Sequence, residues 1–434
     1  MWCLISQPNS VVFEVRGIDP KSIGQKCLEK VCEYLGISNE SDYFGLKFEN
    51  NKGEELWLNL RNPIDRQVHC HGPSNPLRLA LRVKFWVPPH LLLQETTRHQ
   101  FYLHTKVDLL DKQLLAKDWE SVSTLIALIA QAETGDYKPF NPPHTTYVQA
   151  SSISPTDDSP KPPDLLQKII GKHRQFAGMK STTAEYWLLK EAAEFETFGE
   201  ERFVTKHSGG VTLGVGPHGI TIYRNDQPKQ LISFTSILSA SSHKRIFKLE
   251  YLSLESKETL LEIKLDSSHV ASSLYRALTE KHAFYSCETV RSAVTTQFIR
   301  DLKGTIVSIF NEDSTLGKKY VFDIQRTCRE VYDNARRVLY QENIAQVPKI
   351  EPGCFHDDGV SCKDSEEKLH RLMDALTCKI CMDNQIDVVF LPCAHVVACT
   401  SCAARVDRCP LCRSEFERAQ KLYLPSEFCR ELAT

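Results

Sequence analysis

A cluster of cysteine and histidine residues near the C-terminal end constrains this chain more than any other feature. The chain has 16 cysteines in 434 residues, and seven of them fall between residues 378 and 412 together with one histidine. Their spacing is C-x2-C-x11-C-x-H-x3-C-x2-C-x6-C-x2-C. Each Cys-x2-Cys pair lets two thiolates reach one ion, so eight ligands predict two zinc sites. The candidate ligands are Cys378, Cys381, Cys393, His395, Cys399, Cys402, Cys409 and Cys412.

Thiolate and imidazole ligands suit zinc better than calcium or magnesium. Four protein ligands per ion leave no open coordination position, so the expected metals are structural. A segment this short buries little apolar surface. Metal binding must therefore supply much of its folding free energy, on the order of 10 kcal/mol per site. A zinc hydrolase is disfavoured because no open site is expected and no His-Glu-x-x-His motif is present.

A disulfide framework is the alternative for this cluster, and it would need an oxidising compartment. The first residues, MWCLISQPNS, lack the basic segment and long apolar run of a secretory signal. No stretch approaches 18 uninterrupted apolar residues, the length expected of a membrane span. We therefore favour zinc and expect a cytoplasmic protein.

The ligand spacing resembles the C3HC4 RING finger family, in which the ligands interleave between two zinc ions. The resemblance implies that Cys378, Cys381, Cys399 and Cys402 bind one ion. It implies that Cys393, His395, Cys409 and Cys412 bind the other.

In ubiquitin ligases of this family, the RING finger docks a ubiquitin-charged E2 enzyme through exposed apolar residues on the zinc loops and intervening helix. The residues expected to form that surface are Ile380, Val406, Pro410 and Leu411, with Val406 in a helical stretch after Cys402. Arg413 follows the last ligand, where active ligases often place a cation that bridges E2 and ubiquitin; a guanidinium offers donors in a fixed fork. The alternative is that these side chains only pack the small domain or a dimer partner.

The flanks of the cluster suggest a homodimer formed through the RING finger. Residues 365–377 place apolar side chains at helical spacing. Residues 421–424 place Leu422 and Leu424 on one face of a short strand. The alternative is that both flanks pack within one chain.

The chain is too long for one domain on the usual prior of about 100–200 residues each. Its formal net charge of −2 gives no global attraction to nucleic acid. Strand patterns and a helix over 27–37 predict a β-grasp fold in residues 1–87, with Cys27 and Cys32 on the apolar stripe of that helix. Residues 88–199 are predicted to be helical, with a flexible loop at 138–163, which is rich in Pro, Ser and Thr. Residues 200–285 read as strands and a final helix with N-cap oxygens near Ser267, as in PH/PTB-like modules.

This order resembles the three-lobed FERM domain, and supporting segments are Trp57–Leu60, Gly135–Tyr137 and the final helix of the third lobe. The expected fold is multidomain α+β. A helical extension is expected over 286–345, followed by a linker at 346–364 and the RING domain with its flanks at 365–434. The linker contains Cys354, His356 and Cys362, which either hold an additional metal or have no such role.

The FERM resemblance implies a PTB-like groove in lobe three that binds the cytoplasmic tails of membrane receptors, such as lipoprotein receptors. An extended tail would pair with the sheet edge near 235–240, beside the last helix. Tyr275 and Thr279 share a helix face and are expected to line the groove. The alternative for Tyr275 is a half-buried anchor.

FERM domains often lie at membranes, so the chain is expected to be peripheral at the plasma membrane or endomembranes. Anionic lipids are a candidate partner of a basic surface, although such charges are usually just a solvated helix face. Its residues would be Lys318, Lys319, Arg326, Arg329, Arg336 and Arg337.

Combined, the resemblances imply a FERM–RING E3 ubiquitin ligase whose FERM lobe selects receptors and whose RING finger recruits E2. The alternative function is a non-enzymatic adaptor that links receptors to the cytoskeleton, with the RING finger as a dimerisation module.

Overall fold

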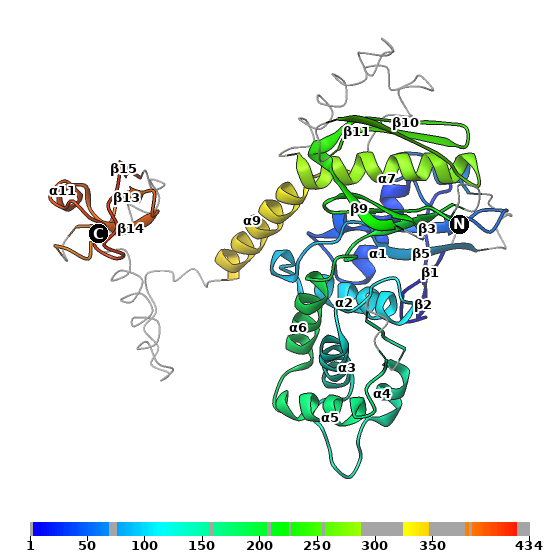
Figure 1. Ribbon diagram of the computed structural model, residues 1–434, viewed down its shortest axis with the longest axis horizontal. Helices are drawn as coiled ribbons and strands as arrows, with labels where there is room; N and C mark the ends of the chain where they lie inside the picture. The colour runs from blue at the N-terminus through cyan, green and yellow to red at the C-terminus, as the bar shows by residue number, and fades with distance from the viewer. Residues whose placement is uncertain are drawn as a thin grey trace, which may run out of the picture. The chain divides into compact units, whose positions relative to one another are not determined.

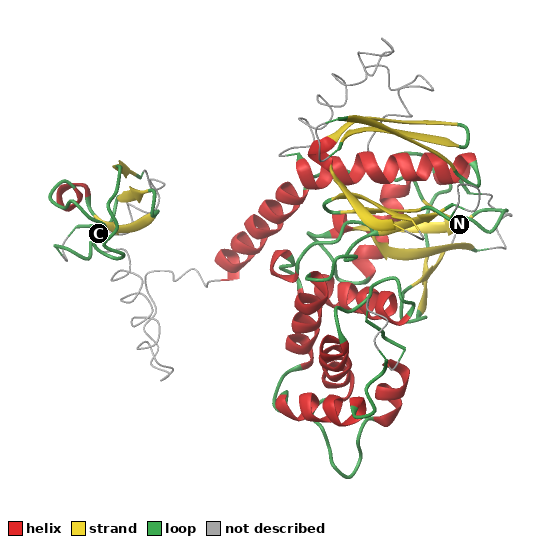
Figure 2. Ribbon diagram, viewed as in Figure 1, coloured by secondary structure: helices red, strands yellow, loops and turns green. Residues whose placement is uncertain are grey.

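The computed structural model describes residues 3–68, 76–150, 152–155, 160–205, 210–224, 227–253, 257–287, 324–346, 378–381 and 384–422. The chain divides into two compact units, Met1–Val347 and Pro348–Thr434. The first unit contains three successive lobes, which are a mixed sheet with a helix, a helical bundle, and two sheets with a capping helix (Figures 1 and 2).

Lobe 1 is a five-stranded sheet covered by one long helix. Its strands run in the order β2-β1-β5-β3-β4, with β1 and β5 parallel and the other pairs antiparallel. The elements are β1 (Cys3–Ser6), β2 (Val12–Val15), α1 (Gly24–Tyr34), β3 (Phe44–Glu49), β4 (Glu55–Trp57) and β5 (Leu77–Val83). Cys27 and Cys32 lie on the buried stripe of α1, as the sequence pattern predicts. This is the expected β-grasp.

Lobe 2 is a helical bundle built around α3. Its helices are α2 (Glu95–Leu110), α3 (Trp119–Thr134), α4 (His144–Ala150), α5 (Leu165–Gln175) and α6 (Ser181–Ala193). The Asp118 side chain accepts from the Ser121 N–H at 2.8 Å and caps the start of α3. Gly135 ends the helix with a φ of 73°, a conformation that favours glycine.

The stretch predicted as a flexible loop, 138–163, contains α4, so that prediction is corrected for its described residues. The Tyr147 side chain is buried, and its hydroxyl bonds His173 Nδ1 at 2.6 Å. Ile153 is also buried in the bundle core. A few apolar anchors therefore order a segment whose overall Pro, Ser and Thr content suggested a loop.

Lobe 3 consists of two antiparallel sheets and α7 (Ser268–Ser286). One sheet has the order β6-β7-β8-β9 and the other β10-β11-β12. The strands are β6 (Glu201–Val204), β7 (Thr212–Gly216), β8 (Gly219–Arg224), β9 (Gln227–Ser233), β10 (Ile237–His243), β11 (Ile246–Leu252) and β12 (Glu258–Lys264). Ser267 caps α7 by accepting from the Val270 N–H at 3.1 Å, as predicted.

Buried polar contacts join lobe 3 to lobe 1 through α7. Lys84 follows β5 and pairs with Glu280 at 2.7 Å, and both side chains are nearly inaccessible to solvent. Burial raises the pKa of Glu280, but the Lys84 and Arg276 cations outweigh burial and hold that pKa well below its usual range. The Trp57 indole N–H also donates to Glu201 at 2.8 Å. The Lys84–Glu280 pair fixes α7 against lobe 1, and the Trp57–Glu201 bond joins β4 of lobe 1 to β6 of lobe 3.

After lobe 3 the chain forms α9 (Cys328–Gln346). Ile324, Thr327, Val331 and Ala335 are all buried. Among the described residues, no helix combines the length and apolar character needed to cross a membrane.

We expect Lys84→Met to lower the free energy of unfolding of the first unit by about 3 kcal/mol, because it leaves the buried Glu280 with only Arg276 as a partner. Chemical denaturation of the full chain, followed by tryptophan fluorescence, measures this loss. Lys47→Met is the matched control. Its ion pair with Glu55 is partly exposed, so its loss should cost at most about 1 kcal/mol. Equal losses in the two variants would contradict the role given to the buried pair.

Candidate metal centre

In its described residues, the second unit contains a small antiparallel sheet with the order β14-β13-β15 and one short helix. Its elements are β13 (Val388–Leu391), β14 (His395–Ala398), α11 (Thr400–Ala403) and β15 (Arg418–Lys421). β15 overlaps the strand predicted at 421–424 at Lys421, and residues 423 and 424 lie outside the described residues. Phe390 is fully buried and packs against Phe416 with ring centroids 4.7 Å apart. In the described residues the apolar core consists of this aromatic pair, a few aliphatic and alanine side chains and the buried cysteines, so side-chain packing alone provides little stability.

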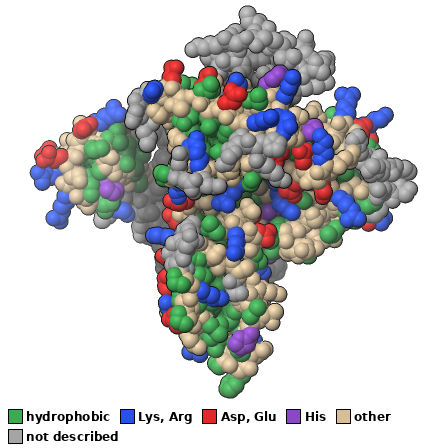
Figure 3. Space-filling view, turned by 45° about the vertical axis from the view of Figure 1, so that its right-hand side comes forward, with side chains coloured by type: hydrophobic (Ala, Val, Ile, Leu, Met, Phe, Trp, Pro, Cys, Tyr) green, Lys and Arg blue, Asp and Glu red, His purple; other side chains and the backbone are tan. Residues whose placement is uncertain are grey.

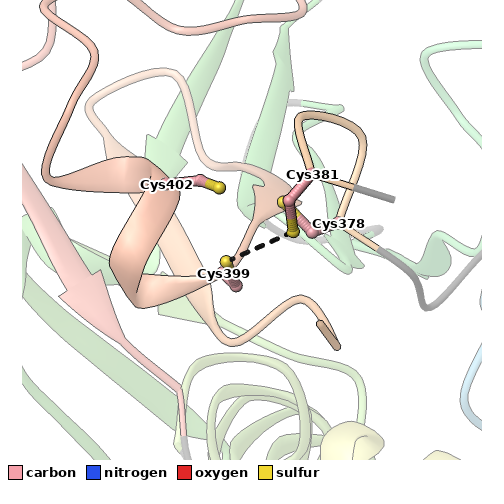
Figure 4. A group of neighbouring side chains, drawn as sticks. All are labelled: Cys378, Cys381, Cys399 and Cys402. Atoms are coloured by element: carbon pink, nitrogen blue, oxygen red, sulfur yellow. Dashed lines mark hydrogen bonds between the residues drawn. The ribbon is translucent and has the colours of Figure 1, made fainter. Parts of the chain in front are cut away.

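One ligand set consists of Cys378, Cys381, Cys399 and Cys402. Cys378 and Cys381 come from the loop before β13, whereas Cys399 and Cys402 lie at the start of α11 and within it (Figure 4). The four sulfur atoms lie within 4.8 Å of one another. The Sγ atoms of Cys381 and Cys399 are 3.9 Å apart. Tetrahedral zinc with bonds of about 2.3 Å places two sulfurs about 3.8 Å apart, so this set fits zinc.

The other set consists of Cys393, His395, Cys409 and Cys412, whose ligand atoms also lie within 4.8 Å of one another. His395 begins β14, and Cys409 and Cys412 follow α11 in a loop. The distance between Cys409 Sγ and His395 Nδ1 is 3.6 Å. A sulfur and an imidazole nitrogen on one tetrahedral zinc are also about 3.6 Å apart. The structure thus brings the eight side chains together in the two interleaved sets predicted from the RING resemblance.

Hydrogen bonds around the thiols favour the metal-binding thiolate form. A bond with the Ser401 hydroxyl lowers the pKa of Cys399 to about 6, and one with Ser414 lowers the pKa of Cys412 to about 6. The Ile380 N–H donates to Cys378 Sγ at 3.5 Å. Burial, followed by the neighbouring cysteines, raises the pKa of Cys402 to about 12. Four thiolates this close repel one another, so a bound cation is needed to hold all of them ionised.

The residues proposed to contact E2 differ in exposure. Ile380 is 40% exposed and Leu411 63% exposed, and each lies between the two cysteines of a Cys-x2-Cys pair. Pro410 and Arg413 are also exposed. Val406 is half-buried against the core of the unit and lies beyond α11. The predicted helical position of Val406 is therefore corrected, because α11 already ends at Ala403.

In lobe 3, Tyr275 is half-buried against the core, as the anchor alternative also expects. The Thr279 hydroxyl donates to the carbonyls of Tyr275 and Arg276 in its own helix, at 3.0 and 3.1 Å. β10 is an edge strand of its sheet among the described residues and packs beside α7. The structure therefore places Tyr275 and Thr279 on a helix next to a sheet edge.

The remaining candidates divide into described residues and residues outside the description. Leu422 is half-buried, and its N–H donates to the Asp387 carbonyl at 2.7 Å. Arg326 pairs with Asp42 at 2.8 Å, so this cation of the proposed lipid-binding set already has a carboxylate partner within the protein. The residues that lie outside the description are Leu424, Cys354, His356, Cys362, Lys318, Lys319 and the 365–377 flank.

Two local interactions were missed in the sequence. Asp387 accepts from the Thr400 N–H at 2.6 Å and from its hydroxyl at 2.8 Å, which fixes the start of α11 beside a ligand pair. Thr327 and Glu330 form a reciprocal capping box at the start of α9. The Thr-x-x-Glu spacing was visible in the sequence, whereas the Asp387 contact depends on folding across a turn.

We expect metal analysis of the full chain to find close to two zinc ions, and Cys381→Ser to lose about one because it removes a ligand from one set only. Cys287→Ser is the matched control, since this half-buried cysteine lies in the first unit. Unchanged zinc in the Cys381 variant, or an equal loss in the control, would contradict the assignment.

Comparison with known proteins is consistent with this geometry. Residues 8–70 match the FERM N-terminal domain family, residues 87–203 the FERM central domain, and residues 205–293 the FERM C-terminal PH-like domain. Residues 374–419 match the C3HC4-type zinc finger family, or RING finger.

The similar curated proteins are much longer than the matched region. Mouse tyrosine-protein phosphatase non-receptor type 14 is 32% identical over 61% of this chain and 22% of the relative. The Drosophila melanogaster protein 4.1 homolog is 27% identical over 63% of this chain and 16% of the relative. The matching stretch thus spans less than a quarter of either relative.

Two solved structures share the fold. The FERM and C-terminal domain complex of Drosophila Merlin is 21% identical, with a TM-score of 0.55 over 66% of this chain and 96% of that chain. The MyTH4-FERM MF2 domain of Dictyostelium discoideum myosin VII, mutant 1, is 14% identical, with a TM-score of 0.51 over 66% of this chain and 61% of that chain. The chain therefore contains a three-lobed FERM domain followed by a RING-type zinc finger.

Proposed function

We propose that this chain is a RING-type E3 ubiquitin ligase in which the zinc finger recruits a ubiquitin-charged E2 enzyme. The observation that carries the proposal is the exposure of Ile380 and Leu411 on the two zinc-binding turns. The RING core is small, so a large apolar side chain would gain stability by packing inward. Two such side chains point outward on metal-fixed loops, which is the surface that an E2 partner needs.

The chemistry of transfer would take place on the E2 enzyme. The zinc ions would hold the loops in shape and have no open position for substrate. A substrate lysine amine would attack the E2–ubiquitin thioester carbonyl, forming a C–N bond, breaking the C–S bond and releasing the E2 thiolate and a proton. Arg413, exposed directly after the last ligand, supplies a cation to bridge E2 and ubiquitin.

The FERM domain would select the substrate through lobe 3. An extended receptor tail would add to the β10 edge beside α7, and its backbone would pair with the strand. Tyr275 would contact the tail with its exposed part. Thr279 would contribute mainly its methyl group, because its hydroxyl already donates within the helix.

The proposed substrates are receptors with lipoprotein-receptor-like tails, which would be ubiquitinated and degraded. The segments LRVKFWVPPHLLLQETTRHQFYLH and LGKKYVFDIQRTCREVYDNARRVLY resemble the myosin regulatory light chain-interacting protein, a FERM–RING ligase also called the inducible degrader of the LDL receptor. We propose the same class of target, a peripheral position at the plasma membrane or endomembranes, and a RING homodimer. Leu422 and Leu424 are the proposed dimer residues.

A basic lipid-binding surface has less support. Basic and acidic side chains are intermixed on the face of the molecule in Figure 3. Arg326 is paired with Asp42, and Arg329 lies 3.9 Å from Asp333. Any attraction to anionic lipid would therefore rest on the remaining cations of the proposed set.

The second candidate is the non-enzymatic adaptor, which the similarity to protein 4.1 and Merlin favours. Both candidates need the receptor-binding groove, and the proposed ligase alone needs the E2 surface. A ubiquitination assay across a panel of E2 enzymes therefore separates them.

We expect Ile380→Ala to reduce autoubiquitination at least tenfold while leaving zinc content unchanged, because it removes an apolar contact to E2 and no metal ligand. In vitro ubiquitination with quantitative immunoblotting measures the first quantity, and metal analysis the second. Lys379→Ala, at the exposed neighbouring position, should retain activity. Full activity of the Ile380 variant would refute the E2 surface, and loss of zinc would instead point to unfolding.

We expect the double variant Tyr275→Ala/Thr279→Ala to weaken binding of a receptor-tail peptide at least tenfold without changing autoubiquitination. Fluorescence polarisation with the full chain measures the affinity. Glu258→Ala, an exposed position on β12 at the opposite edge of the sheet from β10, is the control. Tail affinity equal to that of the native chain would exclude this face of α7 as the groove.

A further inference from the structure

The helix α9 lies outside every segment matched to the FERM and RING families, which end at residue 293 and resume at residue 374. Its start is well defined. The Thr327 N–H donates to Glu330 Oε2 at 2.9 Å, and the Glu330 N–H donates to Thr327 Oγ1 at 3.3 Å. This capping box satisfies two backbone donors and fixes where the helix begins.

Polar contacts tie the start of α9 to lobe 1. Arg326 Nη1 lies 2.8 Å from Asp42 Oδ2, and the Asp42 side chain is nearly buried. Burial raises the pKa of Asp42, and Arg326 partly opposes that shift by stabilising the carboxylate. Arg61 Nη2 also donates to the Ile324 carbonyl at 3.4 Å. Both lobe-1 partners are far away in the sequence, so these contacts are tertiary anchors.

Apolar packing continues the attachment along one face of the helix. Thr327, Val331 and Ala335 repeat every four residues, and each is fully buried. Ile324 and Val331 belong to the hydrophobic core that lobes 1 and 2 share. The next two residues, Arg336 and Arg337, are exposed. The first half of α9 therefore lies against the FERM body through a single stripe.

This attachment changes the length of chain that joins the FERM domain to the zinc finger. With α9 docked, 31 residues separate Gln346 from Cys378, and they span at most roughly 105 Å. With α9 released, the end of α7 at Ser286 is taken as the last attachment, since it is the last described element before α9. The 91 intervening residues then span at most roughly 270 Å, with α9 still helical.

We propose that α9 is a strap on lobe 1 that fixes where the chain departs for the zinc finger and so limits the reach of the zinc finger. A shorter tether raises the local concentration of the zinc finger near anything held by the FERM domain. The anchoring residues are Asp42 and Arg326, with Val331 and Ala335 as the packed stripe. The proposal concerns reach alone and does not depend on ligase activity.

The test introduces a glutamate at two neighbouring positions of α9, one on the packed stripe and one on the exposed face. Ala335→Glu puts a carboxylate into a fully buried site and should release α9, because an unpaired buried charge is strongly unfavourable. Arg336→Glu puts a carboxylate at the exposed neighbour and is the control. Hydrogen exchange followed by mass spectrometry measures docking of residues 328–335. Small-angle X-ray scattering of the full zinc-loaded chain measures its radius of gyration.

We expect Ala335→Glu to speed amide exchange over 328–335 at least tenfold and to increase the radius of gyration by roughly a tenth or more. Arg336→Glu should change neither quantity. Release of the helix without an increase in the radius of gyration would overturn the proposed limit on reach. Equal exchange in both variants would overturn the docked stripe itself.

Circular dichroism shows whether the FERM domain of a variant is still folded. A milder variant keeps the proposal testable if it is not. If Ala335→Glu unfolds the domain, Val331→Ala replaces it, because it removes two methyl groups from the same stripe and adds no charge. We then expect about tenfold faster exchange over 328–335 and a smaller increase in radius. Native exchange in this variant would contradict the strap.

Discussion

The C-terminal unit brings thiol and imidazole side chains into two sets that fit zinc, and we infer that metal coordination by these sets is the interaction on which the unit depends. Among the described residues, its apolar core is limited to the Phe390–Phe416 pair, a few aliphatic and alanine side chains and the cysteines themselves, so side-chain packing alone provides little stability. Two interleaved ligand sets tie the turns before β13 and after α11 to the rest of the unit. Ile380 and Leu411 face outward from the turns that carry the ligand pairs.

In the FERM domain, α7 contacts lobe 1 and also forms one side of the candidate groove. One side of the helix carries Glu280 and Lys281, which reach lobe 1 and the backbone of lobe 3 through buried polar contacts. A neighbouring side carries Tyr275 and Thr279 next to β10. A buried ion pair lacking one partner is costly, so the position of α7 relative to lobe 1 is strongly specified. The contact between α7 and lobe 1 therefore also sets the position of one side of the candidate peptide groove.

Most of the fold and the metal centre could be predicted because their signals are local. Ligand spacing, the stripe of Cys27 and Cys32 and the Ser267 cap each depend on residues a few positions apart. The order of α4 within 138–163 could not be predicted, because it rests on the Tyr147–His173 contact across the bundle. The docking of α9 could not be predicted from the sequence for the same reason, since Asp42 and Arg326 are 284 positions apart. The helical position predicted for Val406 was wrong because α11 ends at Ala403. The residues that would contact E2 and receptor tails remain predictions.

The central claim is that metal-fixed loops present an E2-binding surface. Single-turnover discharge of ubiquitin from a panel of E2 thioesters to free lysine tests it most directly, because no receptor is needed. The account predicts that the full zinc-loaded chain accelerates discharge from at least one E2 at least tenfold, and that removing zinc abolishes the effect. Discharge at the rate of E2 alone throughout the panel, with zinc bound, would contradict the account.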